Sequence, residues 1–456
     1  MKREKVIRTT APFVFIFIFA LLISYIQSPG YILWGDSYIR WNFAKSISIN
    51  GFFNDYKSMG FDNWHNTFPT ILQSLSWRIA ESITIFSFLQ AFVYISTFFL
   101  LLNCFIGRSI SLFVSLLFFI FPINAAYSVM NMPDVMIVPF IILSALVFTK
   151  SDKIKQKAGN TCYVITMILL FLMSIWTRPS FAVTAPVYGW IICSNKKLKP
   201  IFAVAITIFA ALTMNIWDSV LNVKVYSPAS VGMAAEVVGV SKMSDGNFCN
   251  TCLDFVGNTS LAREHYDNTD AGKMLWDKTG GLIPEKVAAI SNEKTISGLY
   301  KTAIFSETKK FLLLKLDKAL ALLGISGPVK LYSFYTPSDY DRLSELCGGC
   351  YQSTFRYSIN EVSIYLSSLL YFPVHPWLMM VLSLGSACFV RKEQRGAALF
   401  ITVLGIAYYA SFILNMQRVE FRYFYPSFVL FSLVIILGIK DVLIKLTTQV
   451  GSSLSS

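Results

Sequence analysis

The feature that most constrains this chain is a series of long apolar runs with almost no charged residues inside them. We count about ten runs of a length that can cross a bilayer as helices, which need roughly 20 mostly apolar residues each. Their approximate limits are 11–27, 82–105, 109–122, 135–149, 161–177, 180–194, 200–217, 363–390, 396–414 and 426–440. The eighth run contains Pro373 and Pro376, which favour a kink. The sequence therefore predicts an all-α polytopic membrane protein.

The placement of the basic residues supports this fold class. Only 14% of the residues are charged, whereas a soluble domain has about a quarter. A net charge of +13 would suggest nucleic acid binding in a soluble protein. Here the basic residues lie between the apolar runs and gather in alternate connections, as cytoplasmic loops do. The basic connections contain Arg108; Lys150, Lys153, Lys155 and Lys157; Lys196, Lys197 and Lys199; and Arg391, Lys392 and Arg395. We therefore expect contact with membrane lipids, no nucleic acid, and both termini on the cytoplasmic side.

This topology divides the chain into three parts. Residues 1–217 form an N-terminal transmembrane module with a first outside loop at 28–81. Residues 218–362 form a small extracytoplasmic domain, and 363–456 carry the last helices. The basic start resembles a signal peptide, but no small-residue cleavage site follows Ile26, so we expect a retained first helix. Within the outer domain, residues 311–326 contain two lysines and an aspartate among leucines, which predicts an amphipathic surface helix rather than a crossing.

Two carboxylates stand at outside ends of predicted helices. Asp36 follows the first apolar run, at the start of a predicted surface helix over residues 37–49. It is either a helix N-cap or a general base at the lipid–water boundary. Asp134 follows Pro133 at the start of the fourth run, where capping is again an alternative to chemistry.

Arginines lie on the same predicted side. Arg178 stands in a turn between two helix ends, where it either reaches the lipid headgroups or binds a phosphate. The last outside loop contains Arg418, Glu420, Arg422 and Tyr423. That loop is either an aromatic belt at the membrane surface or a phosphate-binding site with aromatic rings that stack on a sugar. His375 is the one titratable residue well inside a run. Ion-coupled carriers usually have several charged or titratable residues at membrane depth, so this scarcity argues against such a carrier.

Taken in order along the chain, these residues resemble the GT-C membrane glycosyltransferases. The resemblance rests on an early acid (Gly35-Asp36-Ser37-Tyr38), an Asp before the fourth run (Pro133-Asp134), an Arg-Pro turn (Arg178-Pro179) and a late Arg-Tyr-x-x-Pro element starting at Arg422. It covers residues 1–215 best and the outer domain hardly at all. It implies a GT-C-like fold of about ten helices and sugar transfer outside a bacterial inner (cytoplasmic) membrane, in the periplasm.

The resemblance also implies roles for individual residues. Asp36 would be the catalytic base and Asp134 would support it, while Arg178, Arg418 and Arg422 would face the donor phosphate. The substrate-binding candidates are Tyr38, Arg40, His65, Glu420 and Tyr423. Many relatives have Asp-Glu where this chain has Asp36-Ser37, and the first loop has no Asp-x-Asp pair. We therefore name no metal ligand and no cofactor, and dependence on a divalent metal is left open.

The expected reaction moves a hexose, with glucose as the first candidate, from a polyprenyl-phosphate donor to lipid-linked O-antigen or another cell-surface glycan. The chain length, the basic cytoplasmic loops and the outer domain look like O-antigen-modifying glucosyltransferases, which include phage-borne serotype converters of lipopolysaccharide. A donor-synthesising enzyme and a flippase would be its functional partners. Two other functions stay open: an O-antigen polymerase or ligase, and a non-enzymatic flippase or transporter of lipid-linked sugars.

Four cysteines of the outer domain form two C-x-x-C pairs, Cys249 with Cys252 and Cys347 with Cys350. This spacing, used twice, can build a zinc site of four thiolates. The predicted outside location favours disulfides, within or between the pairs, and the sequence does not determine which.

Overall fold

The computed structural model describes residues 2–26, 35–64, 66–276, 280–289, 293–326, 329, 375–414 and 418–453. Every regular element in these ranges is a helix. The strand-like pairings among them are isolated bridges, which join Asp62 to Lys224, Gly257 to Leu282, and Asp270 to Arg418. The expected all-α class is therefore confirmed for the described part of the chain.

The helices fall into three groups along the chain. The first group is α1 (Lys2–Ile26), α2 (Gly35–Asn50), α3 (Thr67–Ala80), α4 (Ile83–Leu102), α5 (Arg108–Ile120), α6 (Pro122–Val129), α7 (Pro133–Met136), α8 (Val138–Thr149), α9 (Ser151–Thr177), the 3-10 helix η1 (Pro179–Thr184), α10 (Ala185–Ile192), α11 (Lys199–Thr213) and α12 (Ile216–Val220). The second is α13 (Pro228–Met243), α14 (Thr259–His265), α15 (Gly272–Trp276), α16 (Pro284–Ala289), α17 (Glu293–Ser306) and α18 (Thr308–Leu322). The third is α21 (Pro376–Phe389), α22 (Lys392–Leu414) and α23 (Phe421–Ser453).

Five helical segments of the described ranges are long and apolar enough to cross a membrane. They are Ile83–Leu102, Ser151–Thr177, Lys199–Val220, Lys392–Leu414 and Phe421–Gln449. Helices α5 and α6 together would make a sixth, although they meet at a bend of 86°. Three further apolar helices are shorter: Thr10–Ile26, Pro133–Thr149 and Pro376–Phe389. These segments support a membrane protein, and ten complete crossings stay a prediction.

Proline sets the start of two helices that matter for the site. Pro133 begins α7 and Pro179 begins η1. Proline is tolerated in a first helical turn because the N–H that it lacks would have no acceptor within the helix there. The residues before them, Met132 and Arg178, have extended backbones, as expected before proline. Each proline thus separates two apolar segments.

Aromatic side chains join the first and third groups of helices. Tyr127 of α6 stacks on Tyr425 of α23, with ring centroids 4.3 Å apart. The hydroxyl of Tyr94 on α4 lies 3.2 Å from that of Tyr425, and all three residues are fully buried. In lipid, close packing and interhelical hydrogen bonds hold helices together more than hydrophobic burial does. These contacts therefore fix α23 against the N-terminal helices.

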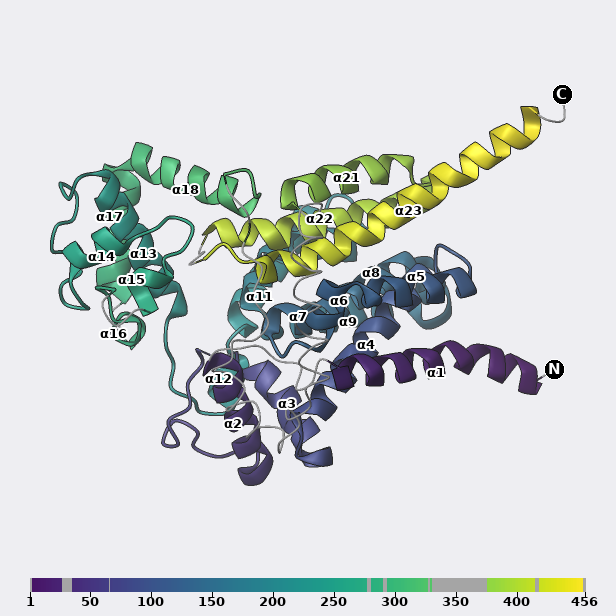
Figure 1. Ribbon diagram of the computed structural model, residues 1–456, viewed down its shortest axis with the longest axis horizontal. Coiled ribbons are helices and arrows are strands. Elements are labelled where there is room, and N and C mark those ends of the chain that lie inside the picture. Colours follow the sequence, from purple (N-terminus) through teal and green to yellow (C-terminus); the bar gives the residue numbers. More distant parts are fainter. Residues whose placement is uncertain are drawn as a thin grey trace.

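Helices α13–α18 form a separate small domain with its own apolar core. In Figure 1 this domain lies at the opposite end of the molecule from the N- and C-termini. We refer to residues 228–326 as the outer domain and to the end of the helical bundle nearest to it as the site end. The boundary expected at residue 217 falls inside α12.

The amphipathic helix expected at residues 311–326 corresponds to α18. It has 15 residues and is not among the described helices that are apolar enough for a membrane span. Leu314 and Lys318 are buried against the rest of the outer domain, whereas Leu312 and Leu316 are exposed. This helix therefore belongs to the outer domain.

Helix α2 covers the surface helix expected over residues 37–49. Together with α3 it runs across the long axis of the bundle, near the site end of α1 (Figure 1). Phe43 and Ile47 of α2 share a small core with Leu221 and Val223, which follow α11. The first loop is thereby attached to the segment that leads into the outer domain.

Candidate functional site at the site end of the bundle

An ion pair between Asp134 and Arg178 lies at the site end. Asp134 is in the first turn of α7, and Arg178 follows the last residue of α9. The Nε atom of Arg178 is 2.9 Å from Oδ1 of Asp134. The carboxylate side chain is 2% exposed and the arginine side chain is 24% exposed. The buried acid therefore holds an arginine that still reaches the surface of the site.

Tyr408 of α22 supports the same carboxylate. Its hydroxyl donates to Oδ1 of Asp134 at 3.2 Å, and its side chain is fully buried. Burial lowers the pKa of Arg178, but the Asp134 carboxylate and the neighbouring tyrosines outweigh this effect, so the pKa lies above its ordinary value. The arginine is therefore a permanent cation. A carboxylate engaged by two donors is better suited to orienting that cation than to accepting a proton.

A second arginine, Arg422, enters from the start of α23. Its Nε lies 2.5 Å from Oε2 of Glu420, which is 3% exposed. Its Nη2 donates to the Tyr423 hydroxyl at 3.0 Å, and its Nη1 lies 3.3 Å from the Met132 sulfur. Met132 is two residues before Asp134. Arg422 thus lies directly beside the segment that carries the first ion pair.

The ring of Tyr423 connects the two arginines. The guanidinium carbon of Arg178 is 5.6 Å from the ring centroid, and that of Arg422 is 4.9 Å from it. Phe412 of α22 stacks on Tyr423 at 4.6 Å and also lies 5.5 Å from the Arg178 guanidinium. Cation–π contacts of this kind stabilise cations that are partly removed from water. Two cations from distant parts of the chain are therefore held around one aromatic pair.

Arg418 extends this cluster toward the outer domain. Its Nε lies 2.9 Å from Oδ1 of Asp270, and its Nη1 lies 3.9 Å from Oε1 of Glu420. A Cβ atom at Gly272 would lie 1.9 Å from Nη2 of Arg418. A larger residue at position 272 would therefore displace this guanidinium. We call Asp134, Arg178, Arg418, Glu420, Arg422 and Tyr423 the arginine cluster.

Arg40 lies at a second polar centre, next to the break between α6 and α7. It is 4% exposed, and its Nη1 donates to the Asn131 carbonyl at 3.0 Å. The Asn131 side chain accepts from Gln73 of α3. Gln90 of α4 donates to the carbonyls of Ser128 and Met130, at 3.0 and 2.8 Å. These side chains satisfy backbone carbonyls that the helix break would otherwise leave unpaired in an apolar setting.

The structure brings six of the predicted site residues into the arginine cluster, and Arg40 into the neighbouring centre. The side chains of Asp36 and Tyr38 lie outside the described residues, although their backbones belong to α2. His65 lies outside them altogether. The proximity of Asp36 to Asp134 therefore stays a prediction.

The sequence reasoning missed Tyr408, Phe412, Gln73, Gln90 and Asn131. Gln73 and Gln90 carried a usable signal, because an amide on an apolar, buried helix face calls for a polar partner. Tyr408 and Phe412 carried none, since aromatic residues are common in apolar runs.

The arrangement fits an anion better than a metal ion. Among the described residues no group of three or more His, Cys, Asp or Glu side chains could hold a metal. An arginine has five N–H donors in a planar fork, so pairing through Nε leaves further donors for a phosphate. The three arginines are accompanied by two carboxylates of the cluster, Asp134 and Glu420, and by Asp270 of the outer domain.

The cysteines are described for the first C-x-x-C pair. Cys249 and Cys252 form a disulfide with each other. Cys347 and Cys350 lie outside the described residues. Ser241 of α13 donates to the Cys249 carbonyl, which ties the disulfide loop to the centre of the outer domain.

Comparisons with known proteins do not add to this description. No family model matches the sequence, and no curated protein matches it.

Proposed function

We propose that this chain is a GT-C-type membrane glycosyltransferase. It transfers a hexose, with glucose as the first candidate, from a polyprenyl-phosphate donor to lipid-linked O-antigen or another cell-surface glycan. One observation carries this proposal: Arg178 and Arg422 flank Tyr423, beside Asp134, at one end of a bundle of apolar helices. A phosphate on an isoprenoid lipid presents its charge at the membrane surface, where the ends of spanning helices lie.

The chemistry needs cations more than any other group. When the sugar leaves, the polyprenyl phosphate departs with an additional negative charge, and cations near its oxygens stabilise that charge in the transition state. Arg178 and Arg422 supply them, and their planar forks suit phosphate oxygens. Asp134 keeps Arg178 in place and Glu420 does the same for Arg422. Aromatic rings such as Tyr423 and Phe412 suit the apolar face of a sugar.

The acceptor hydroxyl needs a base, and we assign that role to Asp36. Asp134 is engaged by an arginine and a tyrosine, so it acts as a positioning group. Asp36 lies in the first turn of α2. This assignment follows the resemblance of the early Gly-Asp-Ser-Tyr segment to the GT-C enzymes.

The proposed topology has ten crossings in a bacterial inner membrane. The termini lie at the end of the molecule away from the outer domain, as an even number of crossings requires (Figure 1). The basic connections would be cytoplasmic and the arginine cluster periplasmic. In this topology a donor-synthesising enzyme works on the cytoplasmic face and a flippase delivers the donor.

Reconstitution tests the proposal. Purified protein in lipid nanodiscs is mixed with polyprenyl-phosphate hexoses and lipid-linked O-antigen, and products are separated by size. We expect single-hexose addition, with glucose tested first. A ladder of polymerised repeats would indicate a polymerase instead, and no product with any donor would remove the transferase assignment. Asp36→Asn should abolish transfer while the protein still inserts at normal levels, and full activity of that variant would exclude Asp36 as the base.

A further inference from the structure

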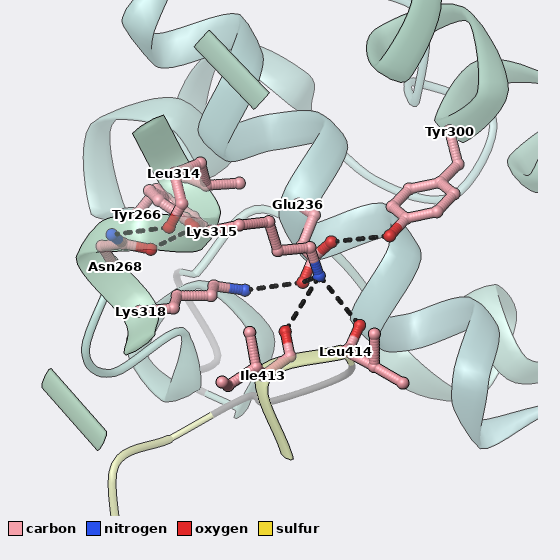
Figure 2. A network of polar contacts seen from close by, with 9 residues as sticks. All are labelled: Glu236, Tyr266, Asn268, Tyr300, Leu314, Lys315, Lys318, Ile413 and Leu414. Atoms are coloured by element: carbon pink, nitrogen blue, oxygen red, sulfur yellow. Dashed lines mark hydrogen bonds and ion pairs between the residues drawn. The ribbon is translucent and has the colours of Figure 1, made fainter. Parts of the chain in front are cut away.

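A buried carboxylate lies at the centre of the outer domain. Glu236 of α13 is 1% exposed, and one of its oxygens, Oε1, contacts Nζ of Lys315 at 2.6 Å and Nζ of Lys318 at 3.0 Å. Its other oxygen accepts from the Tyr300 hydroxyl at 3.0 Å. Figure 2 shows these groups converging from three helices of the outer domain. Burying three charges costs desolvation energy, and an apolar core would avoid that cost.

Lys315 does more than neutralise Glu236. The same Nζ donates to the carbonyls of Ile413 and Leu414, at 3.0 and 2.9 Å (Figure 2). These are the last two residues of α22. The final carbonyls of a helix have no partner within the helix, and a cation is favoured there by the helix dipole. One ammonium group therefore joins the outer domain to the end of α22.

The outer domain also holds the start of the next helix. The Val419 N–H donates to the Thr269 carbonyl at 2.9 Å, and Arg418 pairs with Asp270. Asn268 donates to the Leu314 carbonyl at 3.5 Å, which connects this loop to α18. The described residues on either side of the α22–α23 connection, Ile413–Leu414 and Arg418–Val419, are thus both held by the same domain.

These two helices carry half of the site. Helix α22 supplies Tyr408 and Phe412, and α23 supplies Arg422 and Tyr423. Phe412 is one residue before Ile413, and Arg422 is four residues after Arg418. A shift of the connection would therefore move the aromatic pair away from Arg178.

We propose that the outer domain is a clamp on the α22–α23 connection, and that Lys315 and Asp270 are positioning residues for the arginine cluster. Glu236 orients Lys315 within the domain. As far as catalysis is concerned, this inference rests on the proposed transferase function. The clamp itself is a property of the fold and can be measured without substrate.

Lys315→Met tests the clamp, with Lys318→Met as a matched control. Both lysines contact Glu236, and Lys315 in addition donates to the last two carbonyls of α22. Hydrogen–deuterium exchange of the full chain in nanodiscs is followed for residues 410–414. Losing a charge-assisted hydrogen bond should raise the equilibrium constant for local opening of the helix end roughly tenfold or more. We expect about tenfold faster exchange there in Lys315→Met, and exchange within about twofold of wild type in Lys318→Met.

Asp270→Asn tests the other side of the connection and does not touch Glu236. It should speed exchange of residues 418–422 and leave the centre of α13 unchanged. Should Lys315→Met fail to fold, Asp270→Asn alone decides. Unchanged exchange at both sides of the connection would overturn the clamp.

Transfer assays then connect the clamp to catalysis. We expect Lys315→Met to lower the transfer rate at saturating donor about tenfold, and Lys315→Arg, which keeps the cation, to restore most of it. Faster exchange with an unchanged transfer rate would overturn the positioning role. If wild-type protein transfers no sugar, the proposed function fails, while the exchange measurements still decide whether the clamp exists.

Discussion

Arg178 and Asp134 form an ion pair between a partly exposed and a buried side chain, with 2.9 Å between Nε and Oδ1, although they are 44 positions apart in the sequence. Each residue lies next to a proline that begins a helix: Pro133 precedes Asp134, and Pro179 follows Arg178. The acid is almost fully buried, so the arginine must occupy one position. The ring of Tyr423 lies between this pair and Arg422.

Removing the charge of Asp134 should lower transfer without unfolding the protein. Asp134→Asn keeps the size of the side chain and an oxygen that accepts from Tyr408. Arg178 then loses its anchor. Losing a hydrogen bond to a charged group should lower the transfer rate about 10- to 100-fold. Initial rates at fixed donor concentration, compared at equal amounts of inserted protein, measure the effect. A wild-type rate would show that Arg178 needs no such anchor.

Removing the cation of the pair should lower stability in addition to the loss of transfer expected for a phosphate-binding arginine. Arg178→Met leaves the buried Asp134 carboxylate without its cation, and breaking a buried pair in this way costs about 3–5 kcal/mol. The midpoint of thermal unfolding in detergent should fall clearly below that of Asp134→Asn. Combining both substitutions should recover much of the loss, because no charge is then left unpaired. A double variant as unstable as Arg178→Met would contradict this explanation.

Tyr408→Phe isolates the hydroxyl that supports the carboxylate. The ring stays in place, and Asp134 loses one donor at a cost of about 1–3 kcal/mol. We expect a lower unfolding midpoint together with a reduced transfer rate. Tyr163→Phe is the matched control, since Tyr163 is almost equally buried, near the middle of α9, and its ring contacts Lys155 instead of a carboxylate. Equal effects of the two variants would argue against a role for the Tyr408 hydroxyl.

The loop that carries Asp270 should show a specific dependence on pH. Burial raises the pKa of Asp267, but hydrogen bonds from the backbone and hydroxyl of Thr269 outweigh it, so the pKa lies below the ordinary value. A lowered pKa means that the contribution to stability is present above the unfolded pKa of about 3.9 and is lost as the pH falls through the folded pKa. The carboxylate is mostly solvent-exposed, so we expect only about 0.5 kcal/mol.

Asp267→Ala provides the measurement for that dependence. At neutral pH the variant should be slightly less stable than wild type in urea unfolding of the full chain. The difference in unfolding free energy between wild type and variant should shrink as the pH is lowered below about 4. Asp267 of wild type is then protonated in the folded state as well as in the unfolded chain. A difference that grows on acidification would show that the sign of this linkage is wrong.

The Cys249–Cys252 disulfide should stabilise the outer domain only modestly. The two cysteines are three positions apart, so the bond closes a very short loop. Loop-closure entropy then gives about 2 kcal/mol or less. Replacing both by serine should lower the unfolding midpoint slightly and leave transfer nearly unchanged. A loss of all folded protein would show that this disulfide is needed for folding in a way that chain entropy does not explain.

Much of the helical framework could be read from the sequence, because apolar runs, prolines and charge-free spans have local physical causes. Asp134 and Arg178 could be placed at helix ends for the same reason. That they form an ion pair could not, because it depends on how α7 and α9 meet. Tyr408 is a similar case: nothing around it distinguishes a support for a carboxylate from an ordinary aromatic of an apolar run.

The outer domain shows a different limit. The two lysines within the apolar stretch, Lys315 and Lys318, were enough to predict that α18 is amphipathic. Their common partner, Glu236, lies about 80 residues earlier on another helix, since the sequence separations are 79 and 82. Long-range pairing of this kind has no local signature, so the contacts on which the proposed clamp rests could be found only in the folded chain.

The most direct test of the central claim is donor-dependent sugar transfer by wild-type protein and by Arg422→Met, at donor concentrations from well below to well above saturation. Arg422→Met removes a cation that the account places at the donor phosphate while leaving the Asp134–Arg178 pair intact. We expect transfer of a single hexose by wild type and at least a tenfold lower kcat/KM for the donor in the variant. Equal kcat/KM values in the two proteins would contradict it, because the arginine cluster would then have no part in binding the donor.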